Sequence, residues 1–192
     1  MEIQPCLESL SKDFCKLWEN RSEADLEIRC GDKILQVHKA ILIGRSQVFE
    51  AMLQSNMLEK NENFIEIVDV EYPILEIFLK YLYTGTLPNI DVDVCTDLYK
   101  AADKYCVDSL KTRCALFLKE NLTVENACYV LVLADTHCDN DLKQCVTSYM
   151  IQQDIFMYME DGQAFCALHP KLAVDVLYQA YQIMKLTLKS EK

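Results

Sequence analysis

The fold is decided by residues 25–42, which read DLEIRCGDKILQVHKAIL in one-letter code. From Asp25 to Cys30, apolar and polar residues alternate, which is typical of a β-strand with one buried face. Gly31-Asp32 is a turn signal, and the extended pattern resumes from Lys33 to His38. Two such runs joined by two turn residues predict a β-hairpin.

Downstream of this hairpin the sequence predicts helices and one further strand. The stretch from Lys39 to Leu53 has helical spacing, but Gly44 and Ser46 weaken its middle, so it predicts one helix or two short ones. A β-rich run at Phe64–Ile67 predicts the strand. Further helices are expected over residues 73–83, 91–104, 108–120, 124–134, 141–152, 162–168 and 171–188, with Asp108 and Thr123 as N-caps. This order predicts an α+β domain followed by a helical segment, and we find no internal repeat.

Size and charge narrow the possible partners. The 192 residues suit one mid-sized domain with a smaller extension, and a hydrophobic content of 51% allows a core without metals or disulfides. A net charge of −11 argues against nucleic acid and anionic membranes as partners, because like charges repel. No apolar run approaches a membrane span, and the N-terminus lacks the pattern of a signal peptide. We therefore expect a protein of the nucleus or cytoplasm.

Ten cysteines are scattered along the chain without any Cys-x-x-Cys pair. Structural zinc sites usually contain such closely spaced ligand pairs, so this spacing argues against a zinc site. Most of the cysteines lie in apolar stretches, where a reduced Cys behaves as a small hydrophobic residue. We expect free thiols in a reducing compartment.

The sequence offers no catalytic constellation. Its three histidines are His38, His137 and His169, and no acid–base partner is specified for any of them. We interpret His38, which directly follows the hairpin, as a structural residue bonded to the backbone. His137 and Cys138 are sequence neighbours, which do not face each other on a helix. Because the four glycines also lie too far apart for a phosphate loop, we predict a non-enzymatic protein with no catalytic residues, no metal and no cofactor.

An ordered set of motifs surrounds the hairpin and resembles the signature of the BTB/POZ family. It comprises Ala24-Asp25-Leu26, His38-Lys39-Ala40-Ile41-Leu42, Arg45-Ser46-Gln47-Val48-Phe49 and Leu82-Tyr83-Thr84-Gly85. Three further segments resemble the speckle-type POZ protein subgroup: Leu17-Trp18-Glu19-Asn20, residues 101–105 and residues 121–127. In that subgroup a substrate-reading MATH domain precedes the BTB domain, and none is found in this sequence. The resemblance implies a BTB/POZ domain at residues 1–120, with a small mixed sheet flanked by helices, and a helical 3-box and partial BACK segment at residues 121–192.

The same resemblance implies a two-fold dimer. In the subgroup, apolar residues of the first helix and one residue after the His-Lys-Ala motif form the interface, and the matching positions are Leu10, Phe14, Leu17 and Ile41. The residues support this independently, since Leu7 precedes Leu10, Phe14 and Leu17 at three- and four-residue steps in an otherwise polar stretch. Such a stripe is buried either on the chain's own core or against a second subunit.

The resemblance also implies binding to a cullin. Cullin-binding BTB domains carry an apolar residue, any residue and a Glu, which Met57-Leu58-Glu59 matches. The unbranched side chain of Met57 suits an irregular apolar pocket on a partner. The 3-box implies Leu122, Val124 and His137 as further contacts, whereas Leu131 is more simply a core residue of the helix pair.

These features lead to two functional hypotheses. The first is a dimeric substrate-adaptor module that binds cullin-3 in a ubiquitin ligase complex. The alternative is a BTB module that forms homodimers, or heterodimers with related BTB proteins, and acts as a scaffold, a co-repressor or a competitor of full-length relatives. The Met57-x-Glu59 element and the 3-box-like segment favour the first.

Overall fold

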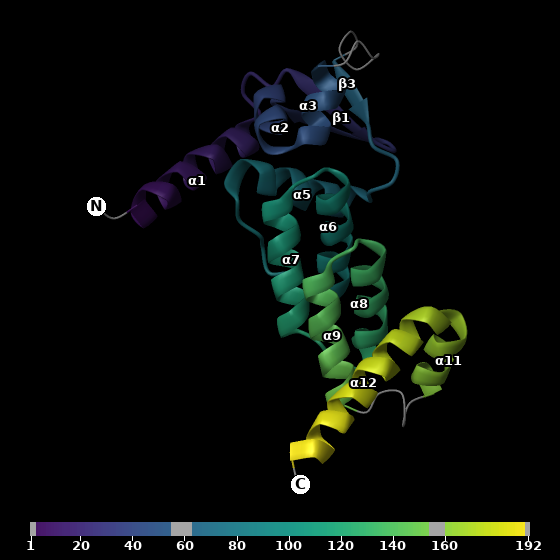
Figure 1. The fold of residues 1–192 in the computed structure, drawn as a ribbon. Coiled ribbons are helices and arrows are strands. Elements are labelled where there is room, and N and C mark those ends of the chain that lie inside the picture. The colour runs from purple at the N-terminus through teal and green to yellow at the C-terminus, as the bar shows by residue number, and fades with distance from the viewer. Residues whose placement is uncertain (1–2, 55–62, 154–159, 191–192) are drawn as a thin grey trace. The chain divides into compact units, whose positions relative to one another are not determined.

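The computed structural model describes residues 3–54, 63–153 and 160–190 (Figure 1). The chain divides into two compact units, Met1–Phe117 and Leu118–Lys192. Within the described residues, none of the helices combines the length and the apolar character that crossing a bilayer requires.

The first unit contains a three-stranded mixed sheet. Strands β1 (Leu26–Cys30) and β2 (Lys33–Val37) pair antiparallel, and β3 (Phe64–Glu66) pairs parallel to β1, in the order β2-β1-β3. The predicted hairpin is therefore confirmed, and Gly31 supplies its turn with a positive φ of 55° that a glycine adopts without strain. The buried residues of the strands alternate with more exposed ones, and they are Leu26, Ile28, Leu35, Val37 and Ile65.

In the described residues of the first unit, six helices accompany this sheet. They are α1 (Ile3–Asn20), α2 (Lys39–Arg45), α3 (Gln47–Gln54), α5 (Tyr72–Thr84), α6 (Val92–Lys104) and α7 (Asp108–Glu120), whose last turn reaches the second unit. Figure 1 shows α2 and α3 beside β1 and β3. In the core, the Phe49 ring stacks on the Tyr105 ring at 4.7 Å, and Phe78 lies 5.4 Å from the same ring. The predicted α+β architecture is confirmed.

Ser46 explains why residues 39–54 form two short helices. Its side chain is buried, its hydroxyl donates to the Tyr105 carbonyl (2.6 Å), and the same oxygen accepts from the Phe49 N–H (3.2 Å). The serine therefore caps α3 and ends α2, as serine does at helix N-termini. The N-cap prediction for Asp108 is wrong, because α7 begins at Asp108 itself and the carbonyl of Val107 accepts from the Lys111 N–H.

The second unit is helical throughout its described residues. It contains α8 (Val124–Thr136), α9 (Asn140–Gln152), α11 (Glu160–Leu168) and α12 (Pro170–Ser190). Thr123 caps α8 as predicted, in a reciprocal capping box with Asn126, and the Asp139 carboxylate caps α9 by accepting from the Leu142 N–H (2.9 Å). The buried apolar residues include Ala127, Val130, Leu131, Leu142, Val146, Met150, Phe165, Leu172 and Val176.

Two helical hairpins of this chain correspond residue by residue, which the sequence alone did not reveal. Helices α6 and α7 form the first hairpin, and α8 and α9 form the second. Each turn has a cysteine with positive φ, Cys106 (52°) and Cys138 (53°), directly after the helix C-cap. An ion pair spans each turn at the same spacing, Asp103–Lys111 at 2.5 Å and Asp135–Lys143 at 2.6 Å.

Candidate protein-interaction site

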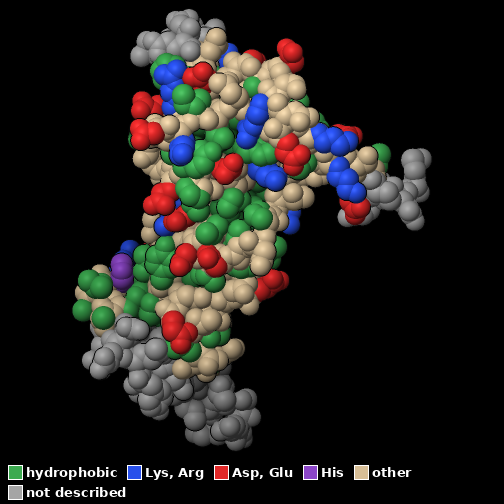
Figure 2. Space-filling model, turned by 180° about the vertical axis from the view of Figure 1, so that it is seen from behind, with side chains coloured by type: hydrophobic (Ala, Val, Ile, Leu, Met, Phe, Trp, Pro, Cys, Tyr) green, Lys and Arg blue, Asp and Glu red, His purple; other side chains and the backbone are tan. Residues whose placement is uncertain are grey.

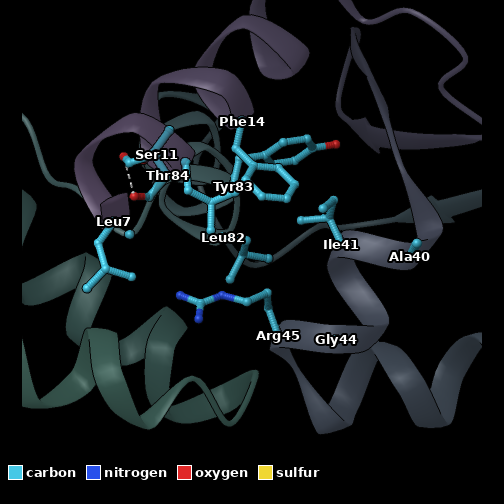
Figure 3. Close-up of a pocket in the computed structure, with 12 residues that line it drawn as sticks. Leu7, Ser11, Phe14, Ala40, Ile41, Gly44, Arg45, Leu82, Tyr83 and Thr84 are labelled. Atoms are coloured by element: carbon cyan, nitrogen blue, oxygen red, sulfur yellow. Dashed lines mark hydrogen bonds between the residues drawn. The ribbon is translucent and has the colours of Figure 1, made fainter. Parts of the chain in front are cut away.

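A groove opens on the first unit between α1, α2 and the end of α5 (Figure 3). Its volume is about 430 Å³, and we call it the α1–α2 groove. Helix α1 contributes Leu7, Leu10, Ser11 and Phe14; α2 contributes Ala40, Ile41, Gly44 and Arg45; and residues 82–85 complete the lining.

Helix α1 is held as a wall of this groove by contacts with α5. Trp18 is buried, and its ring meets the Tyr83 ring edge-on at 5.2 Å. The Ser11 hydroxyl donates to the Thr84 carbonyl (2.7 Å), and the Arg21 guanidinium lies 3.5 Å from the centre of the Trp18 ring. The face of α1 that carries Ser11 and Trp18 is therefore fixed on its own chain, and Leu7, Leu10 and Phe14 beside it line the groove.

Helix α2 is held as the opposite wall by His38 and Tyr83. The Tyr83 hydroxyl oxygen accepts from the His38 backbone N–H (2.8 Å) and lies 2.9 Å from His38 Nδ1, while Nε2 lies 2.7 Å from the Ser22 carbonyl. Because a carbonyl only accepts, Nε2 carries the proton and Nδ1 accepts from the tyrosine. Burial raises the pKa of Tyr83, which keeps this donor protonated. The prediction that His38 is structural and bonded to the backbone is confirmed.

The start of the β-hairpin also fixes α2. The Asp25 carboxylate accepts from the Lys39 N–H (2.8 Å) at the first residue of α2, where free N–H groups attract negative charge. Ile41 and Arg45 lie one helical turn apart, so this anchoring directs both side chains into the groove (Figure 3).

The geometry of this unit has known counterparts. A sequence model of the BTB/POZ domain matches residues 14–122, more than half of the chain. The chain belongs to the BTB/POZ family. BTB domains are non-catalytic modules for protein–protein interaction, so the groove is a candidate site on such a module.

Solved BTB structures show the same fold. The BTB (Tramtrack and Bric a brac) domain of human gigaxonin superimposes with a TM-score of 0.50 at 23% identity, covering 58% of this chain and 92% of that one. The BTB domain of zebrafish PATZ1 gives a TM-score of 0.52 at 16% identity, covering 63% of this chain and 98% of that one. At these identities the likeness establishes the fold alone.

The BTB groove brings together three of the four residues predicted for the dimer interface. Leu10 is 53% exposed, and Phe14 and Ile41 are half-buried; all three line the groove. Leu17 is half-buried and lies outside the lining. Sequence reasoning did not identify Arg45, although its position four residues after Ile41 was a signal for the same helix face. Their role as interface residues stays a prediction.

The residues predicted to bind the cullin are only partly described. Met57, Leu58 and Glu59 lie outside the described residues of this BTB protein. Leu122 and Val124 are half-buried at the start of α8, and His137 is half-buried at its other end, so the structure does not bring His137 together with the first two. Leu131 is fully buried, which agrees with its interpretation as a core residue.

A second pocket, of about 320 Å³, lies in the second unit, where Val132, Lys143, His169 and Leu172 are among its lining residues. In residues 3–54, 63–153 and 160–190, no group of three or more His, Cys, Asp or Glu residues could hold a metal ion. The ten cysteines are free, two of them buried at Cys95 and Cys114, where burial and the neighbouring thiol raise the pKa of Cys114. On the face shown in Figure 2, acidic side chains lie among basic and hydrophobic ones instead of forming one patch.

Proposed function

We propose that this BTB protein is a dimeric adaptor that binds cullin-3 in a ubiquitin ligase complex. The observation that carries the proposal is the α1–α2 groove, because it collects Leu10, Phe14 and Ile41 from two separate helices. The proposal includes membership of the speckle-type POZ protein subgroup and activity in the nucleus or cytoplasm.

The dimer follows from the exposure of the groove. Leu7 and Leu10 remain 55% and 53% exposed, although Ser11 and Trp18 on the same part of the helix surface are held by α5. Contiguous apolar surface of this kind usually marks a binding site for another protein. A two-fold axis beside α1 would cover the groove of each copy with the same surface of the other, which is the commonest way in which chains form dimers.

The cullin contact rests on the extension beyond the BTB match and on the Met57-x-Glu59 element. In the proposal, residues 1–120 form the BTB domain and residues 121–192 form the 3-box and a partial BACK segment. Val124 in the first turn of α8, Leu122 just before that helix and His137 at its C-cap then contact the cullin, and Met57 fills an apolar pocket on it. This arrangement gives the chain a means of holding the scaffold.

Calorimetric titration with the N-terminal region of cullin-3 tests this function. We expect binding in the micromolar range or tighter, and a loss of about 2 kcal/mol or more for Met57→Asp, because a charge would replace an apolar anchor. Gln54→Asp, at the exposed end of α3, is the matched control and should bind like the wild type. Absence of binding by folded wild-type protein at about 50 μM, a concentration at which even a weak complex would form, would reject the adaptor function. A dimer that does not bind the cullin would favour the scaffold, co-repressor or competitor alternative.

A further inference from the structure

Arg45 stands out as the charged side chain among the residues that line the α1–α2 groove, where it is exposed to water. Its side chain extends from the end of α2 toward Leu82 and Leu7 (Figure 3). No ion pair joins Arg45 to any carboxylate of the part of the chain that the structure describes, and its nearest ring, Tyr81, lies 5.9 Å away. An arginine keeps its charge at any ordinary pH, and a charge covered by another chain requires a partner. Whatever fills this groove should therefore bring an acid.

Helix α1 carries such an acid at the border of its exposed stripe. Asp13 follows Leu10 by three residues and precedes Leu17 by four, so it shares their side of the helix. Glu8 lies at the other border of the groove face, beside Ser11, whereas Asp13 lies on the border that carries Leu10 and Leu17. Asp13 pairs with Lys16 at 3.1 Å, but both side chains are well exposed, and exposed pairs of this kind are weak and exchange readily.

We propose that Arg45 forms an ion pair with Asp13 of a second copy, and that this pair selects which chains form dimers. The inference rests on the proposed dimer and deepens it. In a two-fold arrangement each copy supplies one Arg45 and one Asp13, so that two identical pairs form. Apolar packing then supplies affinity, and the charge pair rejects partners that carry the wrong sign.

Gly44 is an independent sign that another chain approaches α2 closely. It lines the groove next to Arg45, its φ is not positive, and a Cβ built on it meets no atom within 4 Å. Nothing in its own chain therefore requires a glycine, although glycine weakens a helix. A glycine at such a position is suited to close approach by a second backbone.

A charge exchange tests the pairing in the full chain. Arg45→Glu and Asp13→Lys each place like charges at both contacts of a homodimer, so each variant alone should dimerise at least tenfold more weakly than the wild type. Mixed in equal amounts, they restore one pair as Glu–Lys and keep the other as Arg–Asp, and a mixed dimer should form near wild-type affinity. Native mass spectrometry of the two variants, distinguished by isotope labelling, measures all three species.

The controls separate this inference from the proposed dimer. Glu8→Lys makes the same charge change at the border of the groove face beside Ser11, away from Leu10 and Leu17, and should leave the dimer unchanged. Leu10→Asp removes the apolar contact and should give a folded monomer whatever Arg45 does. If Leu10→Asp gives a monomer but Arg45→Glu and Asp13→Lys dimerise like the wild type, the proposed ion pair is wrong and the proposed dimer interface is retained. If Leu10→Asp remains dimeric, the proposed interface itself is wrong.

The glycine has its own test. Gly44→Leu should keep the melting temperature of the dilute protein and weaken dimerisation at least tenfold, because the added side chain occupies the space of the second copy. Ala51→Leu, at an exposed position of α3 outside the groove, is the matched control and should change neither quantity. A Gly44→Leu dimer of wild-type affinity would show that no chain approaches α2 closely.

Discussion

The two helical hairpins of this protein share one construction and differ in what they present. In both, two helices of equal length enclose a turn with a left-handed cysteine, and an Asp–Lys pair spans that turn. The first hairpin lies within the BTB match, whereas the second lies entirely beyond residue 122, where the match ends. The extension therefore repeats a design already present in the BTB domain.

The difference lies on the outward positions of the first helix of each hairpin. Helix α6 carries Asp97 and Lys100 there, joined by an ion pair at 2.9 Å. At the corresponding positions of α8 stand Tyr129, which is 47% exposed, and the half-buried Val132. The first hairpin thus carries a charged pair at these positions, and the second carries apolar side chains, of which Val132 lines a pocket with Leu172 of α12. We expect the exposed Tyr129 to serve a contact with a partner.

A second difference concerns the lysine of the Asp–Lys pair. Lys111 of the first hairpin lies 5.4 Å from the Tyr99 ring, within its own hairpin. Lys143 of the second hairpin lies 3.8 Å from Asp175 and so links α9 to α12. The lysine at this position therefore contacts only its own hairpin in the interactions named for Lys111, whereas Lys143 also contacts α12.

Core substitutions at corresponding positions should have the largest effect. Leu110→Ala and Leu142→Ala each remove a fully buried side chain, and we expect each to lower the free energy of unfolding by about 2–5 kcal/mol. Urea unfolding followed by circular dichroism measures both. A loss below about 1 kcal/mol at either position, less than the usual cost of such a cavity, would break the correspondence between the two cores.

The second-largest effect should come from placing the charged pair of α6 at the corresponding positions of α8. The double variant Tyr129→Asp and Val132→Lys recreates the Asp97–Lys100 pair on α8. We expect cullin-3 binding to weaken about tenfold, which is about 1.4 kcal/mol, with little change in thermal stability. The reciprocal variant Asp97→Tyr and Lys100→Val is the control and should bind normally. Unchanged binding by the α8 variant would mean that the apolar surface serves another contact.

Removing the lysines should have a smaller effect. Lys111→Met keeps most of the side-chain volume, and loss of its partly buried ion pair should cost about 1 kcal/mol of folding free energy. Lys143→Met should cost more, because two carboxylates lose their common partner. Thermal melts of both variants in low and high salt compare them, and equal losses would argue that Asp175 contributes nothing.

The smallest effects should come from the two turn cysteines. A side chain in the left-handed region is strained, so Cys106→Gly and Cys138→Gly should each stabilise the fold by about 0.5–1 kcal/mol. Cys128→Gly, in the interior of α8, is the control and should destabilise by about 1 kcal/mol. Chemical unfolding distinguishes the two signs, and destabilisation by a turn glycine would contradict the role given to these turns.

Local features of the fold could be predicted from the sequence, and long-range features could not. The alternation from Asp25 to Cys30 and the two-residue turn fix the hairpin because both act between near neighbours. The groove depends on where the end of α5 meets α1 and α2, so Arg45 had no signal beyond its spacing from Ile41. The repeated hairpin left one signal in the sequence, the pattern Ala-Asp-x-x-Cys-x-x-x-Leu-Lys at residues 102–111 and 134–143. This pattern is short, and most other residues of the two hairpins differ, so a repeat was not predicted. The N-cap prediction for Asp108 was wrong because the short turn after α6 lets α7 begin at Asp108 itself, one residue earlier than predicted.

The central claim is that two copies join through the α1–α2 groove and together hold cullin-3. Sedimentation velocity of the wild-type chain, at 22.2 kDa per copy, mixed with the N-terminal region of cullin-3 tests it most directly. The account predicts a complex of two chains with two cullin regions, and a complex of one with one for Leu10→Asp. A wild-type chain that sediments as a monomer, or a Leu10→Asp chain that still forms the larger complex, would contradict it.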